Sequence, residues 1–521
     1  MRLSRLIIGV VLGVSLVLTQ AGNVFADDAE LLALVKGLQK QIEAQNQSLQ
    51  QQSQRIQQLE SRGPSITNGS TSQLEKDVAL LKRQQEVNQE VQIKKDTDFD
   101  KKVSDAIGGS DKWLKGLAFN GDLRLRYEAF HYNSGQPGSD PDRNRFRFRL
   151  RYGFEKTFNP EWKAGFSLAT SDKQANGTQT DPESANTTFS NNFDYKNIWV
   201  DKAFASYIPE WAKVGPIAAF RITAGKTDNP FERGSTDMIW KTDNVRPEGI
   251  YETADFNLYQ GDNVTLKAYS TLGQFVLNEA SGYGVGNTNV AGKKDAELFA
   301  YQVGINPIFS TSLTQQPIEE LSTLSVYNYP GYAGNGNWRI ISGATTTNLN
   351  NGNIVSPTNS VNLSAGSFNV LSTYHEIKIS PFGVPVAPFV EVADNVSDHS
   401  TPAGIQDSNI AWSTGLKVGK VNKKGDWEAN YAYKWIGANS VVGAFNDLDF
   451  GSSSSVAGQG GGTGRQGSVI KLGYGLTDFL KLNLAAYLVN ELNPGYTNTN
   501  NGGKIWNENV ARFQTDLTWK F

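Results

Sequence analysis

Apolar and polar residues alternate along most of the chain between residue 117 and its end. In the last nine residues, the apolar positions share one face of an extended segment and the polar positions share the other. The apolar face carries Phe513, Leu517, Trp519 and Phe521, and the polar face carries Gln514, Asp516, Thr518 and Lys520. Successive side chains of a strand point to opposite faces, so the pattern predicts β-strands with one apolar and one polar face.

One segment combines this alternation with a high density of charge. Arg145, Arg147, Arg149 and Arg151 alternate with Phe146, Phe148, Leu150 and Tyr152. A soluble β-sandwich with an aromatic core would explain this strand alone. If the strand spans a membrane, an arginine facing lipid would cost about 2–4 kcal/mol at mid-depth, so all four arginines must face inward.

The connections between the extended segments alternate in length. Short ones lie near 159–161, 209–215, 260–263, 309–317, 381–384, 422–426 and 477–479. Long ones lie near 132–143, 172–195, 227–247, 278–295, 329–366, 396–408, 438–466 and 492–508. This alternation is typical of transmembrane barrels and predicts an all-β, antiparallel barrel of about sixteen strands over residues 116–521. The 438–466 loop is rich in serine and glycine, and we expect it to be mobile.

The N-terminal part of the chain has a different pattern. Residues 1–26 resemble a secretory signal, with Arg2 and Arg5 before an apolar run of about 13 residues, short of the roughly 20 that a spanning helix needs. Residues 27–62 carry an apolar heptad, interrupted by Gln45 and Gln52, which predicts an α-helical coiled coil. Residues 63–115 form a linker and a second, weaker helical segment.

Composition removes several classes of function. The 521 residues include no Cys and three His, and the formal net charge is −3. Thiolate sites are therefore excluded and nucleic acid is not an expected partner. Asp140 and Asp142, or Asp394 and Asp398, could bind calcium, but neither spacing fits an EF-hand, so no metal site or cofactor is expected. A barrel hydrolase is one alternative, but Ser372 and His375, in one predicted strand, lie three positions apart and therefore on opposite faces.

Four segments carry a family resemblance. They are residues 119–127 (FNGDLRLRY), 143–154 (RNRFRFRLRYGF), 197–207 (NIWVDKAFASY) and 224–231 (AGKTDNPF). In this order they resemble the putative porins of Gram-negative bacteria, which are similar to the trimeric general porins and often carry an N-terminal coiled coil. The resemblance covers about residues 116–521 and implies a homotrimer in the outer-membrane lipid, with the coiled coil in the periplasm.

The resemblance also implies a constriction. In such porins the loop after the fifth strand, here 227–247, folds into the lumen and sets acids against arginines of the wall. The acids would be Asp228, Glu232, Asp237 and Asp243, and the pore-lining arginines would be Arg124, Arg126, Arg145, Arg147, Arg149 and Arg151. The terminal strand, with Trp519 and Phe521, resembles the signal read by the barrel-assembly machinery.

Three functions follow from these patterns. The first is a water-filled channel for passive diffusion of small hydrophilic solutes and ions, with a mild anion preference from the arginines. The second is an envelope tether, in which the coiled coil reaches across the periplasm to peptidoglycan. The third is the barrel hydrolase, which is the weakest because its residues do not assemble into one site.

Overall fold

The structure is a computed structural model of the chain. It describes residues 116–133, 142–172, 184–190, 192–231, 233–279, 295–310, 316–333, 339–342, 345–348, 353, 363, 366–397, 409–451, 462–492 and 509–521. The predicted signal (1–26), coiled coil (27–62) and linker with second helix (63–115) lie outside the described residues. They therefore remain predictions.

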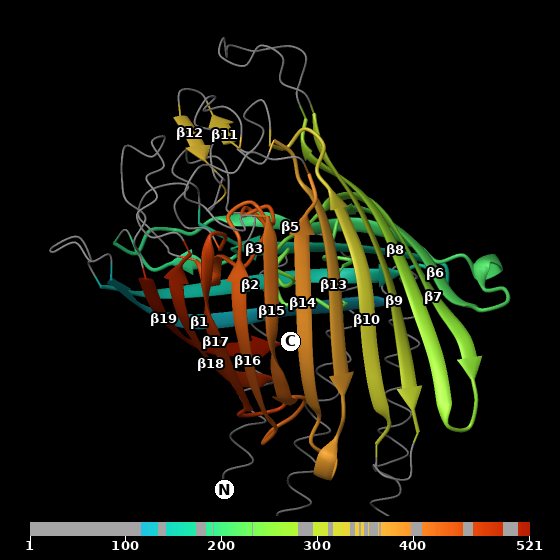
Figure 1. Cartoon of the computed structure of the whole chain (residues 1–521). Coiled ribbons are helices and arrows are strands. Elements are labelled where there is room, and N and C mark those ends of the chain that lie inside the picture. The colour runs from blue at the N-terminus through green and yellow to red at the C-terminus, as the bar shows by residue number, and fades with distance from the viewer. Residues whose placement is uncertain are drawn as a thin grey trace, which may run out of the picture. The chain divides into compact units, whose positions relative to one another are not determined.

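Sixteen antiparallel strands form a closed barrel (Figure 1). The first eight are β1 (Leu117–Asn133), β2 (Arg143–Thr157), β3 (Trp162–Thr170), β5 (Ile198–Tyr207), β6 (Ile217–Lys226), β7 (Glu248–Gln260), β8 (Val264–Asn278) and β9 (Ala296–Phe309). The other eight are β10 (Ile318–Asn328), β13 (Asn369–Lys378), β14 (Val386–Asn395), β15 (Ile410–Gly419), β16 (Trp427–Ile436), β17 (Arg465–Gly475), β18 (Leu480–Glu491) and β19 (Asn509–Lys520).

Three further strands belong to the long loops. β4 (Thr187–Thr188) pairs with β2, whereas β11 (Arg339–Ser342) and β12 (Thr345–Asn348) pair only with each other. Short 3₁₀ helices cover Glu210–Ala212 (η1), Pro381–Gly383 (η2) and Leu448–Phe450 (η3). Within the described residues no helix is both long and apolar enough to cross a membrane.

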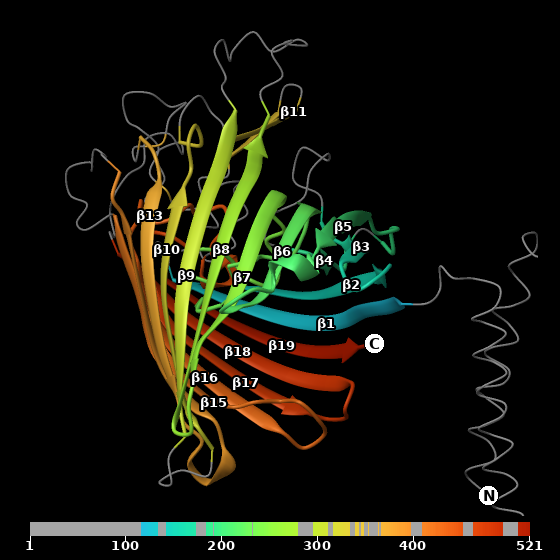
Figure 2. The ribbon, with the colours of Figure 1, turned by 90° about the vertical axis from the view of Figure 1, so that its right-hand side faces the viewer.

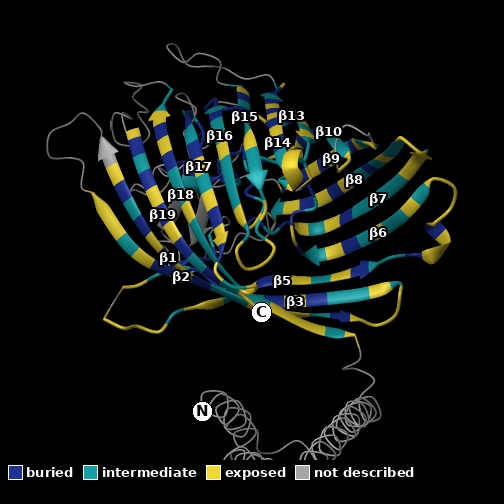
Figure 3. Ribbon diagram, turned by 90° about the horizontal axis from the view of Figure 1, so that it is seen from below, coloured by how far each residue is buried: buried dark blue, intermediate teal, exposed yellow. Residues whose placement is uncertain are grey.

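The alternating apolar and polar residues of the sequence form the outer and the inner face of the barrel wall. Along β1, β2 and β19 the exposed apolar residues alternate with buried polar ones, as the banded strands in Figure 3 show. Phe146 and Tyr152 are 58% and 49% exposed on the outer face, whereas their neighbour Arg149 is 7% exposed. The predicted barrel and its short-turn, long-loop alternation are thus confirmed.

The wall is not equally high all around. β6 ends at Lys226 and β7 begins at Glu248, while β8 continues to Asn278 and pairs there with β9 (Figure 2). The chain leaves the wall between Lys226 and Glu248 as the loop 227–247, called the β6–β7 loop below. This is the third of the long connections that the sequence predicts, and it follows the fifth strand of the wall.

The interior is filled partly by a cluster of aromatic side chains from loops and wall. Trp240 of the β6–β7 loop packs among Phe231, Phe275, Tyr327 and Phe445. Each of these four rings lies 5.8–6.4 Å from the Trp240 ring between centroids. The long loops therefore enclose a packed core inside the barrel.

The last residue closes the barrel. β19 pairs with β1 in register, with Leu517 opposite Leu125. Beyond the strand, the backbone N–H of Phe521 donates to the Gly121 carbonyl (3.2 Å), and the Gly121 N–H donates to the Phe521 carbonyl (2.9 Å). The ring of Phe521 lies on the outer face, 6.3 Å from that of Tyr152. A side chain at Gly121 would collide with this ring and with the Arg151 carbonyl.

Because the backbone bonds do not need the ring, we expect Phe521→Ala to separate assembly from stability. Losing the ring should lower the free energy of unfolding by at most about 1.5–3 kcal/mol. The amount of protein in the outer membrane should fall more, since the terminal aromatic resembles an assembly signal. Phe513→Ala is the matched control, because Phe513 is 50% exposed on the same face and Phe521 is 57% exposed. Equal membrane levels for the two variants would contradict the prediction.

Candidate functional site

The six arginines singled out by the sequence all lie on the inner face of β1 and β2. Arg124 and Arg126 come from β1, and the other four come from β2, directly beside them in register. Their side chains are between 6% and 13% exposed. The arginines are therefore inside the barrel but largely covered, so each needs carboxylates or carbonyls close by.

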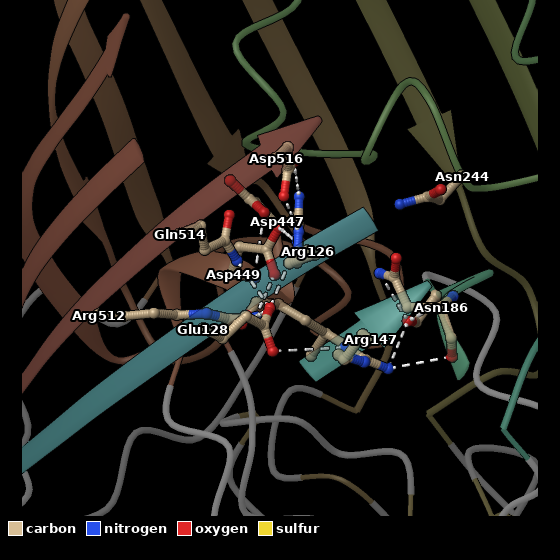
Figure 4. A network of polar contacts seen from close by, with 12 residues as sticks. Arg126, Glu128, Arg147, Asn186, Asn244, Asp447, Asp449, Arg512, Gln514 and Asp516 are labelled. Carbon is tan, nitrogen blue, oxygen red and sulfur yellow. Dashed lines mark hydrogen bonds and ion pairs between the residues drawn. The ribbon is translucent and has the colours of Figure 1, made fainter. Parts of the chain in front are cut away.

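Glu128 of β1 is the centre of this cluster (Figure 4). Its carboxylate is completely buried and accepts from Arg145 Nε (2.5 Å), Arg512 (2.7 Å) and Arg126 (3.3 Å). Arg147 approaches it to 3.7 Å, and Gln514 also donates to it at 3.0 Å. One carboxylate thus compensates several guanidinium groups from three neighbouring strands.

Two further carboxylates of the wall pair with these six arginines, which are called the arginine ladder below. Asp516 of β19 accepts two hydrogen bonds from Arg126, each at 2.7 Å, in the bidentate geometry that favours Arg–carboxylate pairs. Asp122 of β1 accepts from Arg149 Nε at 2.8 Å. Arg124 instead donates to the side-chain oxygen of Asn186 at 2.7 Å. Most of the ladder is therefore compensated by residues other than the predicted loop acids.

The β6–β7 loop crosses the lumen from one wall to the other. On one side, Asp243 lies 3.4 Å from Arg149. On the other side, Thr236 donates its N–H to the buried carboxylate of Glu391 in β14 (2.9 Å) and accepts from Lys434 of β16 (2.7 Å). The middle of the loop, with Met238, Ile239 and Trp240, is 0–4% exposed.

The four predicted acids of this loop occupy different places. Asp243 contacts the ladder through Arg149, whereas Asp237 lies 3.7 Å from Lys471 of β17 and accepts from Thr242. Asp228 pairs with basic residues outside the ladder. Glu232 lies outside the described residues. Of the predicted loop acids that the structure describes, Asp243 is the one that faces an arginine of the ladder. The other carboxylates that pair with the ladder belong to residues that the sequence did not indicate.

A separate charged group lies where the loop leaves and rejoins the wall. Arg246 contacts Asp228 at 2.8 Å and Asp201 at 3.2 Å, and Lys202 contacts Asp228 at 2.9 Å. Asp201 and Lys202 are neighbours in β5, where the register with β3 shifts, as at a β-bulge. Because a bulge interrupts the strict alternation, both side chains can turn inward.

Two cavities lie on either side of this group. The first, about 540 Å³, opens on the long-loop side and is lined by Trp199, Lys226 and Arg246, among others. The second, about 310 Å³, opens toward the short turns and is lined by Lys163, Asp228 and Arg233, among others. The Arg246–Asp228 pair thus joins a residue of one cavity to a residue of the other.

A second long loop contributes charge to the same interior. In the connection between β16 and β17, Asp447 and Asp449 contact Lys241 of the β6–β7 loop at 2.5 and 2.7 Å. Burial raises the pKa of the Asp449 carboxyl, but Arg512, Lys241 and Arg126 outweigh burial and lower the pKa well below its ordinary value. The contribution of this carboxylate to stability is therefore lost only as pH falls through that lowered pKa.

The structure of residues 437–451 differs from the mobile loop that the sequence predicts there. The sequence predicts a mobile loop over 438–466, yet Val441, Val442 and Phe450 are at most 1% exposed. The serine and glycine run that suggested mobility begins only after them, at residues 452–461, outside the described residues. The apolar residues of 441–450 were the available signal for burial.

The histidine and serine of the hydrolase alternative do not meet. Ser372 is 4% exposed on the inner face, whereas His375 is exposed on the outer face. His375 contacts the hydroxyl groups of Ser322 (2.9 Å) and Thr373 (3.1 Å) instead. His131 lies in β1 and contacts Asp142 at 2.7 Å.

We expect Glu128→Gln to destabilise the barrel strongly, because it leaves buried arginines without their shared countercharge. Breaking a buried ion pair from one side costs about 3–5 kcal/mol. The free energy of unfolding in denaturant measures this. Glu155→Gln, which removes a part-exposed carboxylate of β2 paired with Lys163, should cost no more than about 1 kcal/mol. Equal losses in both variants would show that the cluster does not depend on Glu128.

A family model matches much of the barrel. The family model described as putative porin matches residues 134–353 and 387–521. Among solved structures, OprB of Pseudomonas putida has 9% identity and a TM-score of 0.42, with 78% of this chain and 94% of that chain covered. OmpT, an outer membrane protein of Vibrio cholerae, has 11% identity and a TM-score of 0.35, with 78% and 97% covered.

A third solved structure, a mutant porin of Rhodopseudomonas blastica, has 8% identity and a TM-score of 0.33, with 78% of this chain and 100% of that chain covered. No curated protein matches the sequence at a significant level. The family match extends over more than half of the chain and coincides with a closed sixteen-strand barrel that carries inward-folded loops. The chain therefore belongs to the putative porin family and forms an outer-membrane porin channel.

Proposed function

We propose that the channel passes small hydrophilic solutes and ions by passive diffusion, and that its charge selectivity is weak and leans toward cations. This proposal rests on one observation, namely that two carboxylates of the β6–β7 loop are far more exposed to water than the arginines of the ladder. Asp228 and Asp243 have side chains that are 52% exposed. The ladder arginines are 6–13% exposed.

Exposure decides selectivity because a permeating ion responds to charges that it can approach. Buried arginines paired with Glu128, Asp516 and Asp122 contribute little net field to the water-filled part of the lumen. Half-exposed carboxylates attract cations, and the attraction weakens as salt shortens the Debye length. This reasoning replaces the mild anion preference that the arginines suggest when they are considered without their partners.

The path that we propose runs between the β6–β7 loop and the wall of β3, β5 and β7. The Arg246–Asp228 pair joins a lining residue of one cavity on this side to a lining residue of the other, and Lys202 contacts Asp228. Their volumes, about 540 and 310 Å³, suit ions and small solutes. The described residues hold no group of three or more His, Cys, Asp or Glu that would suit a metal ion. The proposal needs neither a cofactor nor catalysis.

The hydrolase alternative has little support in the described residues. The contacts of His375 are two hydroxyl groups on the outer face, away from the lumen. The tether remains compatible with a channel, because it concerns residues 27–62 and not the barrel. We infer that this coiled coil lies in the periplasm, helps to hold a homotrimer in the outer-membrane lipid, and can reach peptidoglycan. The barrel-assembly machinery would recognise Trp519 and Phe521.

The reversal potential in a salt gradient tests the selectivity proposal. Replacing both Asp228 and Asp243 with Asn should move the reversal potential toward anion preference at low salt. The shift should be smaller at about 1 M salt, where the Debye length is only about 3 Å. Arg149→Gln should move it in the opposite direction, because Asp122 and Asp243 lose their shared partner.

The control for these variants is Glu210→Gln. Glu210 lies in the turn between β5 and β6, is 53% exposed and pairs with Lys213. Its exposure matches that of the two aspartates, but it is remote from the constriction. If the aspartate variants shift the reversal potential no more than Glu210→Gln does, these carboxylates do not border the ion path.

Deleting residues 27–110 tests the oligomer. We expect the shortened protein to dissociate from trimer to monomer at lower detergent concentration or temperature than the full chain. Mass measurements by light scattering in detergent give the oligomeric state directly. A shortened barrel that stays trimeric under every condition that the full chain tolerates would assign the coiled coil to tethering instead.

A further inference from the structure

The first part of the connection between β16 and β17, residues 437–451, lies inside the barrel beside the β6–β7 loop. We call this part the inner β16–β17 segment. Val441, Val442, Ala444 and Phe450 are each at most 1% exposed. Asn395 of β14 donates to the carbonyl of Asn439 at 2.9 Å, which attaches the segment to the wall. Such burial is typical of a fixed structural element.

The segment and the β6–β7 loop are joined along their backbones. The Lys241 N–H donates to the Phe445 carbonyl (2.7 Å), and the Asp447 N–H donates to the Asp237 carbonyl (3.1 Å). The rings of Trp240 and Phe445 meet edge to face, 6.4 Å apart between centroids. Because contacts of several kinds join the two elements, displacing one of them should disturb the other.

The charges extend this junction to the wall. Lys241 of the β6–β7 loop contacts both carboxylates of the inner segment, Asp447 and Asp449. Asp449 continues to Arg512 of β19 at 2.6 Å and to Arg126 of β1 at 3.6 Å. A chain of alternating charge thus runs from Lys241 through Asp447 and Asp449 to Arg512 of β19 and Arg126 of β1, and Figure 4 shows the part from Asp447 to Arg126.

The ion pairs of this chain hold the β6–β7 loop in position. Removing the two carboxylates would leave Lys241, Arg512 and Arg126 with fewer counterions in a water-poor site. Lys241 would lose its ion pairs to the inner β16–β17 segment, so the β6–β7 loop would be held less firmly across the lumen. The carboxylates therefore act on the width of the channel through the loop and not through contact with a solute.

We propose that the inner β16–β17 segment is a second constriction element, and that Asp447 and Asp449 are positioning residues that set the size limit for solutes by holding the β6–β7 loop across the lumen. This inference rests on the proposed diffusion function and assigns its size selectivity. The two loops narrow the lumen as one unit, so loss of the ion pairs widens the channel even though neither carboxylate has to touch the permeating solute.

The first experiment compares wild type with the variant carrying both Asp447→Asn and Asp449→Asn. Swelling of liposomes in a graded series of sugars measures the size limit, and planar bilayers measure single-channel conductance. The variant should have a higher conductance and admit larger sugars than wild type. The matched control carries Asp426→Asn and Asp478→Asn, two aspartates of the short turns, and should keep the wild-type limit.

A second variant keeps the experiment decisive if the asparagine variant folds poorly. The chain contains no cysteine, so Asp237→Cys combined with Asp447→Cys introduces one possible disulfide where the two backbones already bond to each other. The oxidised form should keep the narrow limit, because a covalent link replaces the ion pairs. Reduction of the same molecules in the bilayer should raise the conductance, and reoxidation should lower it again.

The outcomes separate this inference from the function on which it rests. If wild type conducts, but both the asparagine variant and the reduced cysteine variant keep its conductance and size limit, the inner segment is not a constriction element while the channel function stands. If folded wild type does not conduct at all, the diffusion function itself is wrong. Widening in both variants, reversed by oxidation in the second, supports the inference.

Discussion

The outer face of this barrel is largely apolar, and this constraint places most charged side chains of the wall in the interior. An arginine on the lipid side would cost about 2–4 kcal/mol near mid-membrane, so the alternation along β2 directs its four arginines, Arg145, Arg147, Arg149 and Arg151, inward. Inside, long loops cover them and leave 6–13% of each ladder side chain exposed. Charges that are both inward and covered must be paired, which is why Glu128 and Asp516 lie among them.

The same constraint shapes the lumen. Paired charges that bridge two walls also fix the loops between them, and the β6–β7 loop is held by Asp243 at the ladder and by Thr236 at Glu391. The inner β16–β17 segment fills part of the remaining space and neutralises Lys241 with two carboxylates. A wide sixteen-strand barrel thereby becomes a narrow channel, and its water-facing charges include half-exposed carboxylates such as Asp228, which pairs with Lys202 and Arg246.

The barrel could be predicted from the sequence because the features that indicate it depend on residues close together in the chain. Period-two alternation, short turns and the inward direction of Arg145 to Arg151 depend on neighbouring residues, and the structure has all three. The carboxylate partners were not predictable in the same way. Asp516 is 390 positions from Arg126, and Asp447 is 206 positions from Lys241, so only strand closure and loop packing bring them together. Neither pairing has a local spacing signal, and the bulge at Asp201 likewise breaks the period-two alternation within β5.

Pairing with carboxylates removes the arginine ladder from the field that a permeating ion experiences. The reversal potential of the unmodified channel in a dilute potassium chloride gradient tests it most directly, because potassium and chloride have nearly equal mobility in water. The account predicts a potential close to zero with a small displacement toward cation preference, set by exposed carboxylates such as Asp228 and Asp243. A large potential of the sign for chloride selectivity would mean that the arginines face the ion path uncompensated, and would contradict the account.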